Sequence, residues 1–284
     1  LRLVYEKFIK VCVAFNPKYQ DVEQMVRLMI FNVKAENEDD HSKNFSFMLD
    51  ENNNWYELLV NNTTLTEVLG VNSTNVTSMK RLFFNCTNIP SVPLFDTSKV
   101  TNMDGMFLNC DNLTSAPLYE TSNVTSMSSM FLSCDKLKTI PLFNTSKVTN
   151  MDGMFNNCNK LTSVPLFDTK TVTSMERMFY ECHSLTNAQL FDTKNVTNMD
   201  RMYYDCSSIA LVPLYNTSKV TNMSYMFNEC TNVQSGALAL YQQASTQTNP
   251  PVFHFATFKY CGIDTPTGSA ELAQIPDDWK KDLS

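Results

Sequence analysis

Cysteine is the potentially reactive residue with the most regular spacing in this 284-residue chain. Thiols repeated at a fixed interval can form disulfides, bind metal or fill a core. Each of these cysteines follows a Phe or Tyr by three residues, and no C-x-x-C pair or histidine partner accompanies them, which disfavours metal. The pattern favours a ladder of buried free thiols, with disulfides as the alternative. The seven cysteines that recur every 24 residues are Cys86, Cys110, Cys134, Cys158, Cys182, Cys206 and Cys230.

The three histidines of the chain do not form a recognisable catalytic arrangement. No serine, cysteine and acid accompany His41, His183 or His254 in a triad-like pattern, and the phosphate-loop, dinucleotide, nucleophile-elbow and zinc-protease motifs do not occur. His183 is expected in an exposed turn and His254 in a packed position. The sequence therefore predicts a protein that is not an enzyme and uses no cofactor and no metal.

A further set of repeated residues could bind a cation or cap turns. Repeated carboxylates can hold calcium in some repeat proteins, but the glycine-rich nonapeptide that supplies such calcium sites is missing. An aspartate or asparagine in a turn commonly accepts a hydrogen bond from the backbone two residues ahead. Turn capping is therefore favoured over calcium binding for Asp96, Glu120, Asn144, Asp168, Asp192 and Asn216.

All these residues belong to one 24-residue repeat, for which residues 148–171 serve as the example. Its first apolar group predicts an extended start that continues into a helical or 3-10 turn. A single unit cannot bury its own apolar residues, so neighbouring units must stack and share a core. The repeat predicts a solenoid whose equivalent side chains form columns. The first apolar group consists of Val148, Met151, Met154, Phe155 and Cys158.

The second apolar group of the unit predicts a short parallel strand. Leu161, Val164 and Leu166 are expected to form it, and Asp168 with Thr169 is expected to end it in a turn. Thirteen of the 16 methionines fall in two repeated slots, as in Met151 and Met154 of this unit, and core filling is favoured over a methionine binding face.

The repeat resembles the BspA-like leucine-rich repeat surface proteins. The similarity is greatest to a 24-residue branch rich in D-T-S-x-V-T-N-M and M-F-x-x-C, seen here in residues 96–110 and 144–158, and it covers residues 52–284. This resemblance implies a leucine-rich-repeat-like solenoid that lies on a cell or particle surface and binds other molecules.

The repeat also suggests the domain boundaries. Residues 1–51 lack it and are expected to form a small α+β module, which either caps the solenoid or anchors it to something larger. A degenerate first coil is predicted over residues 52–75, with Trp55 as a lid, followed by seven full coils over 76–243 and a modified closing coil over 244–284. Because the sequence begins at Leu1, we expect an upstream segment to have been removed or left out.

Composition narrows the range of partners. Charged residues make up 18 % of the chain and the net charge is −7, so nucleic acid and anionic membrane surfaces are disfavoured. No run of about 18 apolar residues occurs, so no membrane span is predicted. The expected partner is a protein or glycan on a cell surface, or neighbouring subunits of a larger assembly.

Function in a solenoid usually resides where repeats differ while their core slots stay fixed. Tyrosine and arginine replace smaller residues in the last three full coils, and both types are frequent in binding hot spots. A solvated edge with weak ion pairs is the alternative. The expected function is non-enzymatic adhesion or recognition at an extracellular, cell or particle surface; the other candidate is a structural component of a phage particle or surface appendage, docked by residues 1–51. The candidate ligand-binding residues are Arg177, Tyr180, Arg201, Tyr204 and Tyr225.

Overall fold

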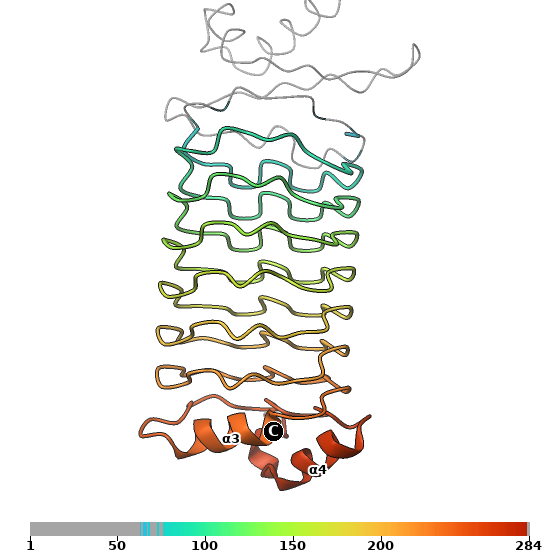
Figure 1. Cartoon of the computed structure of the whole chain (residues 1–284), viewed down its shortest axis with the longest axis vertical. Helices are drawn as coiled ribbons and strands as arrows, with labels where there is room; N and C mark the ends of the chain where they lie inside the picture. Colours follow the sequence, from blue (N-terminus) through green and yellow to red (C-terminus); the bar gives the residue numbers. More distant parts are fainter. Residues whose placement is uncertain (1–62, 64, 67, 69–72, 74–75, 283–284) are drawn as a thin grey trace, which may run out of the picture.

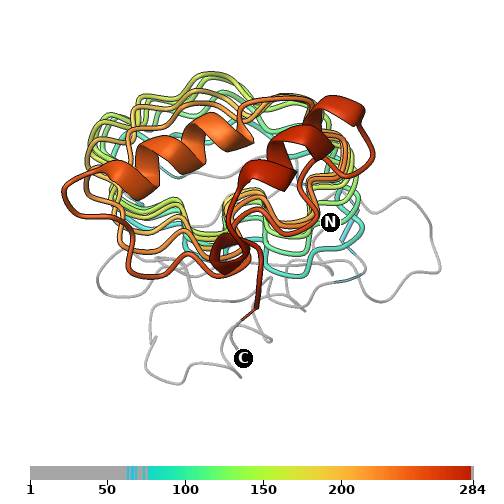
Figure 2. The same cartoon turned by 90° about the horizontal axis from the view of Figure 1, so that it is seen from below.

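The chain forms a solenoid of stacked coils, as the repeat predicts (Figure 1). The structure is a computed structural model and describes residues 63, 65, 66, 68, 73 and 76–282. Seen along the stack, the coils superpose as flattened rings, with two helices across the C-terminal end (Figure 2). The predicted module over residues 1–51 and the proposed lid Trp55 lie outside the described residues.

Successive coils stay in parallel register, one residue pairing with its equivalent in the next unit. Ser126 bridges Asn150, Asn150 bridges Ser174, and the same column continues to Asn222. The last step of this column pairs Asn222 with Phe253, 31 residues further on. Over the described residues these pairings are isolated bridges, so the short strands predicted for each coil are not confirmed as such.

Backbone hydrogen bonds explain why a coil needs its neighbours. Over Met151 to Asn157, every second amide donates to a carbonyl of the following coil, as from Phe155 to Met178 at 2.9 Å. The amides between them close tight turns within the coil, as from Met154 to Met151 at 3.2 Å. About half of this segment's donors are thus satisfied only when the next coil is present, which makes stacking obligatory.

Each full coil carries a left-handed backbone at the same two positions of its first half. In the example unit these are Gly153, with φ 60°, and Asn157, with φ 59°. They lie just before the second methionine and just before the cysteine, and each allows the chain to turn between one inter-coil hydrogen bond and the next. Glycine and asparagine tolerate this conformation best. Other coils place arginine, serine, tyrosine or acidic residues there.

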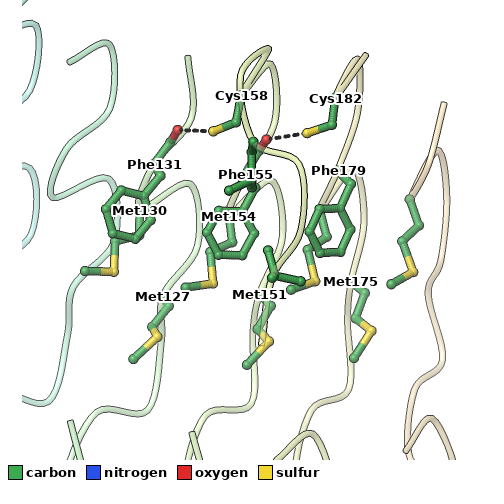
Figure 3. Close-up of a cluster of buried hydrophobic side chains, with 14 of the residues drawn as sticks. Met127, Met130, Phe131, Met151, Met154, Phe155, Cys158, Met175, Phe179 and Cys182 are labelled. Atoms are coloured by element: carbon green, nitrogen blue, oxygen red, sulfur yellow. Dashed lines mark hydrogen bonds between the residues drawn. The ribbon is translucent and has the colours of Figure 1, made fainter. Parts of the chain in front are cut away.

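The first apolar group of every unit packs in the core, as predicted. Phe155 lies between Phe131 and Phe179, with ring centroids 5.8 and 5.5 Å away. The methionines beside these rings are completely buried, and Figure 3 shows both kinds of side chain in parallel columns. The aromatic column runs from Phe83 to Phe258, each ring stacked on the next. The prediction that equivalent side chains align is confirmed.

The second apolar group departs from the predicted strand at one position. Leu161 and Val164 are buried, but Leu166 is 60 % exposed, and Phe167 points inward instead. In equivalent coils the amide after the leucine donates to the carbonyl before it, as from Phe143 to Pro141 at 3.0 Å. This three-residue turn reverses the alternation expected of a strand and turns the leucine side chain outward. The expectation that the apolar residues of each unit share the core was therefore wrong for Leu166.

Two helices and a short 3-10 turn cover the C-terminal end of the stack. Helix α3 spans Ala237–Thr246, α4 spans Pro266–Gln274 and η1 spans Asp277–Trp279 (Figures 1 and 2). Trp279 is 4 % exposed and lies 6.2 Å from Phe258, the last ring of the aromatic column. Trp279 therefore covers the end of the aromatic column.

Candidate functional site

The five candidate residues lie on three successive coils near the C-terminal end of the solenoid; we call them the tyrosine–arginine patch. Arg177, Arg201 and Tyr225 occupy one slot, the left-handed position before the second methionine, with φ of 52°, 53° and 58°. Tyr180 and Tyr204 occupy another slot, two residues before the cysteine. Both slots face outward, because the methionine and phenylalanine between them fill the core. The coil backbone therefore fixes where these side chains start.

The two tyrosines form a stacked pair. Their ring centroids are 4.8 Å apart and the ring planes differ by 7°. Both side chains are half-buried, so part of each remains at the surface. A rigid aromatic pair of this kind offers apolar contact and hydrogen-bonding groups with little loss of side-chain entropy on binding.

Arg201 joins the third tyrosine to the patch. Its guanidinium lies 4.4 Å from the centroid of the Tyr225 ring and also pairs with Asp200. Arg177 is more exposed and pairs with Glu176 at 3.6 Å. The structure thus brings together Tyr180 with Tyr204 and Arg201 with Tyr225, while Arg177 lies in the same column one coil away.

Acidic residues of the neighbouring slot give one edge of the patch a negative charge. Glu181, Asp205 and Glu229 lie on the same three coils, at the left-handed position before the cysteine. Partial burial raises the pKa of Tyr180 to about 12, and the hydrogen bond to Glu181 and the negative charge of Glu181 add to this shift. Partial burial also raises the pKa of Asp205, and it raises the pKa of Glu229 together with the repulsion from Asp205. The patch can therefore offer neutral phenols, a cation and carboxylates to one ligand.

The cysteine ladder carries no reactive site in the described residues. All eight described cysteines are buried, and the seven from Cys110 to Cys261 are free thiols. From Cys110 to Cys230, each thiol of the ladder donates to the carbonyl of the phenylalanine or tyrosine one coil earlier, as from Cys158 to Phe131 at 3.1 Å (Figure 3). Burial raises the pKa of Cys182 to about 12, which keeps this thiol protonated at neutral pH. The prediction of buried free thiols is confirmed there.

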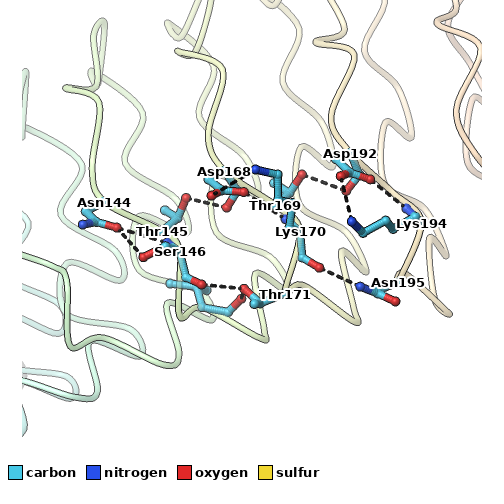
Figure 4. A network of polar contacts seen from close by, with 11 residues as sticks. Asn144, Thr145, Ser146, Asp168, Thr169, Lys170, Thr171, Asp192, Lys194 and Asn195 are labelled. Atoms are coloured by element: carbon cyan, nitrogen blue, oxygen red, sulfur yellow. Dashed lines mark hydrogen bonds and ion pairs between the residues drawn. The ribbon is translucent and has the colours of Figure 1, made fainter.

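The column of acids and amides caps turns, as predicted. Asp168 accepts a hydrogen bond from the amide of Lys170 at 3.2 Å, and Asn144 accepts one from the amide of Ser146 at 3.1 Å (Figure 4). The threonine beside each of them is buried and donates to the next coil, as from Thr145 to the Asp168 carbonyl at 2.7 Å. The side-chain oxygens of the acids and amides therefore hold each turn, and the threonine hydroxyls tie each coil to the next. Within the described part of the chain, no group of His, Cys, Asp and Glu side chains is arranged to hold a metal ion.

The two described histidines take the positions expected of them. His183 is exposed at a turn, with Nδ1 3.0 Å from the carbonyl oxygen of Asp205. His254 stacks on Trp279 at 4.4 Å as part of the terminal packing. His41 lies outside the described residues. Among residues 76–282 and the few described before them, no helix has both the length and the apolar character that crossing a membrane requires.

One surface feature was missed by the sequence reasoning. The outward-turned leucines form a column, which we call the leucine ridge, and each is 55–67 % exposed. The signal was present as an invariant leucine in six successive units, but the spacing alone does not say which way the side chain points. The ridge consists of Leu94, Leu118, Leu142, Leu166, Leu190 and Leu214.

Two solved structures are similar to this chain over most of its length. A leucine-rich cell surface protein from Faecalibacterium prausnitzii A2-165 is similar, with 23 % identity and a TM-score of 0.50 over 72 % of this chain. The match covers 54 % of that protein, so this chain spans about half of its length. A leucine-rich repeat protein from T. pallidum matches 81 % of this chain and 92 % of its own, with 16 % identity and a TM-score of 0.49. The first comparison supports a leucine-rich repeat solenoid.

Family models locate the relationship in the repeat. The model for the HipA-like C-terminal domain matches residues 2–80, nearly all of them outside the described part of the chain. No curated protein sequence matches the chain. A second model, described as "Mycoplasma protein of unknown function, DUF285", matches five overlapping ranges, 53–164, 77–189, 111–211, 136–241 and 186–257. Together these ranges cover residues 53–257, well over half of the 284 residues, so the chain belongs to the DUF285 family.

Proposed function

We propose that this chain is a non-enzymatic recognition module that binds a protein or glycan at a cell surface through the tyrosine–arginine patch. The solenoid acts as a preformed scaffold, and the side chains that differ between coils make the contacts. The resemblance to BspA-like surface proteins and the leucine-rich repeat fold support this assignment.

The observation that carries the proposal is the choice of residues at the left-handed slot. Of the four earlier full coils, two fill this slot with Gly105 and Gly153, where glycine has no steric penalty, and the other two fill it with Arg81 and Ser129, so non-glycine residues do not occupy neighbouring coils there. Arg177, Arg201 and Tyr225 fill it in the last three full coils, and a non-glycine residue there costs roughly 1–2 kcal/mol. Side chains kept at such a cost on three adjacent coils favour a functional role over a merely solvated edge.

The geometry of the patch also suits recognition. The Tyr180–Tyr204 stack and the Arg201–Tyr225 contact are formed within the chain, so a ligand need not order these side chains. Binding to a preorganised surface loses less entropy than binding to a flexible one. Stacked aromatic rings next to carboxylates and a guanidinium can bind the apolar faces and hydroxyl groups of a sugar, or a polar segment of a protein.

The test uses the full chain on two probes, a printed glycan array and cultured cells before and after protease treatment. The patch variant carries Tyr180→Ser and Tyr204→Ser. Its matched control carries Leu108→Ser and Leu132→Ser, the same slot in two earlier coils and likewise half-buried. We expect at least about a tenfold loss of binding for the patch variant, since aromatic anchors dominate many interfaces, and little change for the control.

The results also separate the alternatives. Binding lost after protease treatment of the cells indicates a protein ligand, whereas a signal on the array indicates a glycan. Equal binding by the patch variant and the wild type would remove the patch from the proposal. Recovery of the chain only in stoichiometric particles would instead support the structural role in an assembly. A hydrolytic activity abolished by changing His183 or His254 would contradict the non-enzymatic assignment.

A further inference from the structure

We infer that the leucine ridge is the contact surface of a homodimer, in which two copies of this solenoid pack ridge against ridge. The occupant of the exposed apolar column is thus a second copy of the same chain. This surface is separate from the tyrosine–arginine patch and does not depend on the function proposed for it.

The ridge stands out because nothing inside the chain requires it. Most slots that stay constant from coil to coil are buried or bonded: the exposed Thr149, for example, donates to the Thr125 carbonyl at 3.2 Å. The leucine slot is constant over six coils, has no polar group to bond and is 55–67 % exposed. Other exposed slots vary freely, such as the one that holds Ser98 in one coil and Lys170 in another. A constant, exposed apolar residue that makes no bond within the chain indicates a contact outside the coil.

The exposed area fits a dimer of ordinary size. A leucine side chain presents on the order of 120 Å² of apolar surface, so six at this exposure present roughly 400 Å². A standard interface buries about 800 Å² per partner, a little over half of it apolar. The ridge alone supplies the apolar share. The exposed acid and amide column on one side of the ridge can supply part of the polar rim.

The spacing of the leucines selects a second copy over other partners. Neighbouring leucines are one coil apart, about 4.8 Å along the stack, as for backbones paired in parallel. Side chains on one face of an extended peptide recur every ~6.6 Å, and those on a helix about every 5.4 Å, so neither stays in step over six residues. A second solenoid has the same spacing at every step. A two-fold axis then brings all six leucines of both copies into contact.

Charge disfavours a lipid surface as the alternative occupant. The column next to the ridge carries the exposed carboxylates of Asp96, Glu120, Asp168 and Asp192, and the net charge of the chain is −7. Acidic residues beside an apolar strip repel the anionic lipids that attract peripheral proteins. In a dimer the same carboxylates can stay at the rim in water, since their hydrogen bonds to turn amides are made within their own coil.

Sedimentation equilibrium of the full chain tests the inference. The wild type is expected to approach twice 32.4 kDa as its concentration rises through the micromolar range. The ridge variant carries Leu142→Asp and Leu166→Asp, which place four carboxylates in an apolar contact. Its dissociation constant should rise roughly 100-fold or more, giving a monomer over the same range.

Controls keep the test independent of folding. Val252→Asp and Ile263→Asp place the same charge on apolar residues that are 65 % and 44 % exposed but lie off the ridge, and they should leave the dimer intact. Leu142→Met with Leu166→Met preserves side-chain volume and should also dimerise. The thermal midpoint of the ridge variant at low concentration should equal that of the wild-type monomer. The inference would be overturned by a wild type that stays monomeric or by a ridge variant that still dimerises. It would also be overturned if the wild-type monomer bound neutral lipid vesicles in a flotation assay and the ridge variant did not.

Discussion

The two sides of a single coil repeat with the same period but serve different ends. Phe155 is fully buried and stacks on the equivalent rings of both neighbouring coils, whereas Leu166, eleven residues later, is 60 % exposed. Packing explains why the inner column repeats, because each ring needs a similar ring above and below it. It does not explain the leucine ridge, whose side chains are mostly exposed. Repetition inside the solenoid therefore reports on packing, whereas the repetition of the ridge is the observation behind the proposed contact with a second copy.

The largest difference between the two sides should appear in stability. Phe155→Ala removes a ring from the centre of the column, so we expect a loss of about 3–5 kcal/mol in the free energy of unfolding. Leu166→Ala in the same coil should change it by less than about 1 kcal/mol, because most of the side chain is already in water. Urea titration of both variants would measure this. Equal losses would mean that the inner column is not the core of the molecule.

Alkaline pH should destabilise the inner side selectively. Burial raises the pKa of the ladder thiols, to about 12 for Cys182, against 9.0 for an ordinary thiol. Between these pH values the thiols of the unfolded chain have lost protons that the buried thiols of the folded chain still hold. The free energy of unfolding is therefore highest below about pH 9 and falls as the pH rises toward 12. The thermal midpoint should decline progressively over this range, and buried Tyr203 adds to the effect. A midpoint independent of pH up to 11 would contradict the buried thiol ladder.

A single thiol can be examined without changing the pH. Cys158→Ala removes the donor to the Phe131 carbonyl and leaves a small void, so we expect a loss of about 1–3 kcal/mol. Its control is Lys160→Ala, an exposed position in the same coil, which should change stability by at most about 0.5 kcal/mol. Thermal unfolding checks both. A loss for the control as large as that for Cys158→Ala would refute the assignment of these slots to core and surface.

The smallest expected effect has the opposite sign. Arg177→Gly relieves a left-handed arginine, and the glycines in the same slot of two other coils show that the backbone accepts the change. We expect stability to rise by about 0.5–1 kcal/mol while binding through the tyrosine–arginine patch weakens. Denaturant midpoints and binding to the array are measured on the same sample. Lower stability would show that Arg177 serves the fold.

The contrast between inner and outer columns also shows what a sequence can predict. The 24-residue spacing of Cys158 and its equivalents was enough to predict stacked coils, buried sulfurs and aligned rings, since only stacking satisfies that pattern. The outward direction of Leu166 was not predictable, because in equivalent coils it follows from a three-residue turn after a proline that breaks the alternation of a strand. The Tyr180–Tyr204 stack was only suggested, since adjacency in a column does not fix how two rings are oriented.

The most direct test of the separation between core and recognition surface is a paired measurement on the Tyr180→Ser, Tyr204→Ser variant. Binding to the array or cells and the urea midpoint are determined on one preparation and compared with the wild type. We predict at least about a tenfold loss of binding with a midpoint that changes little, since both side chains are already half in water. Unchanged binding, or binding lost only together with the fold, would contradict the account.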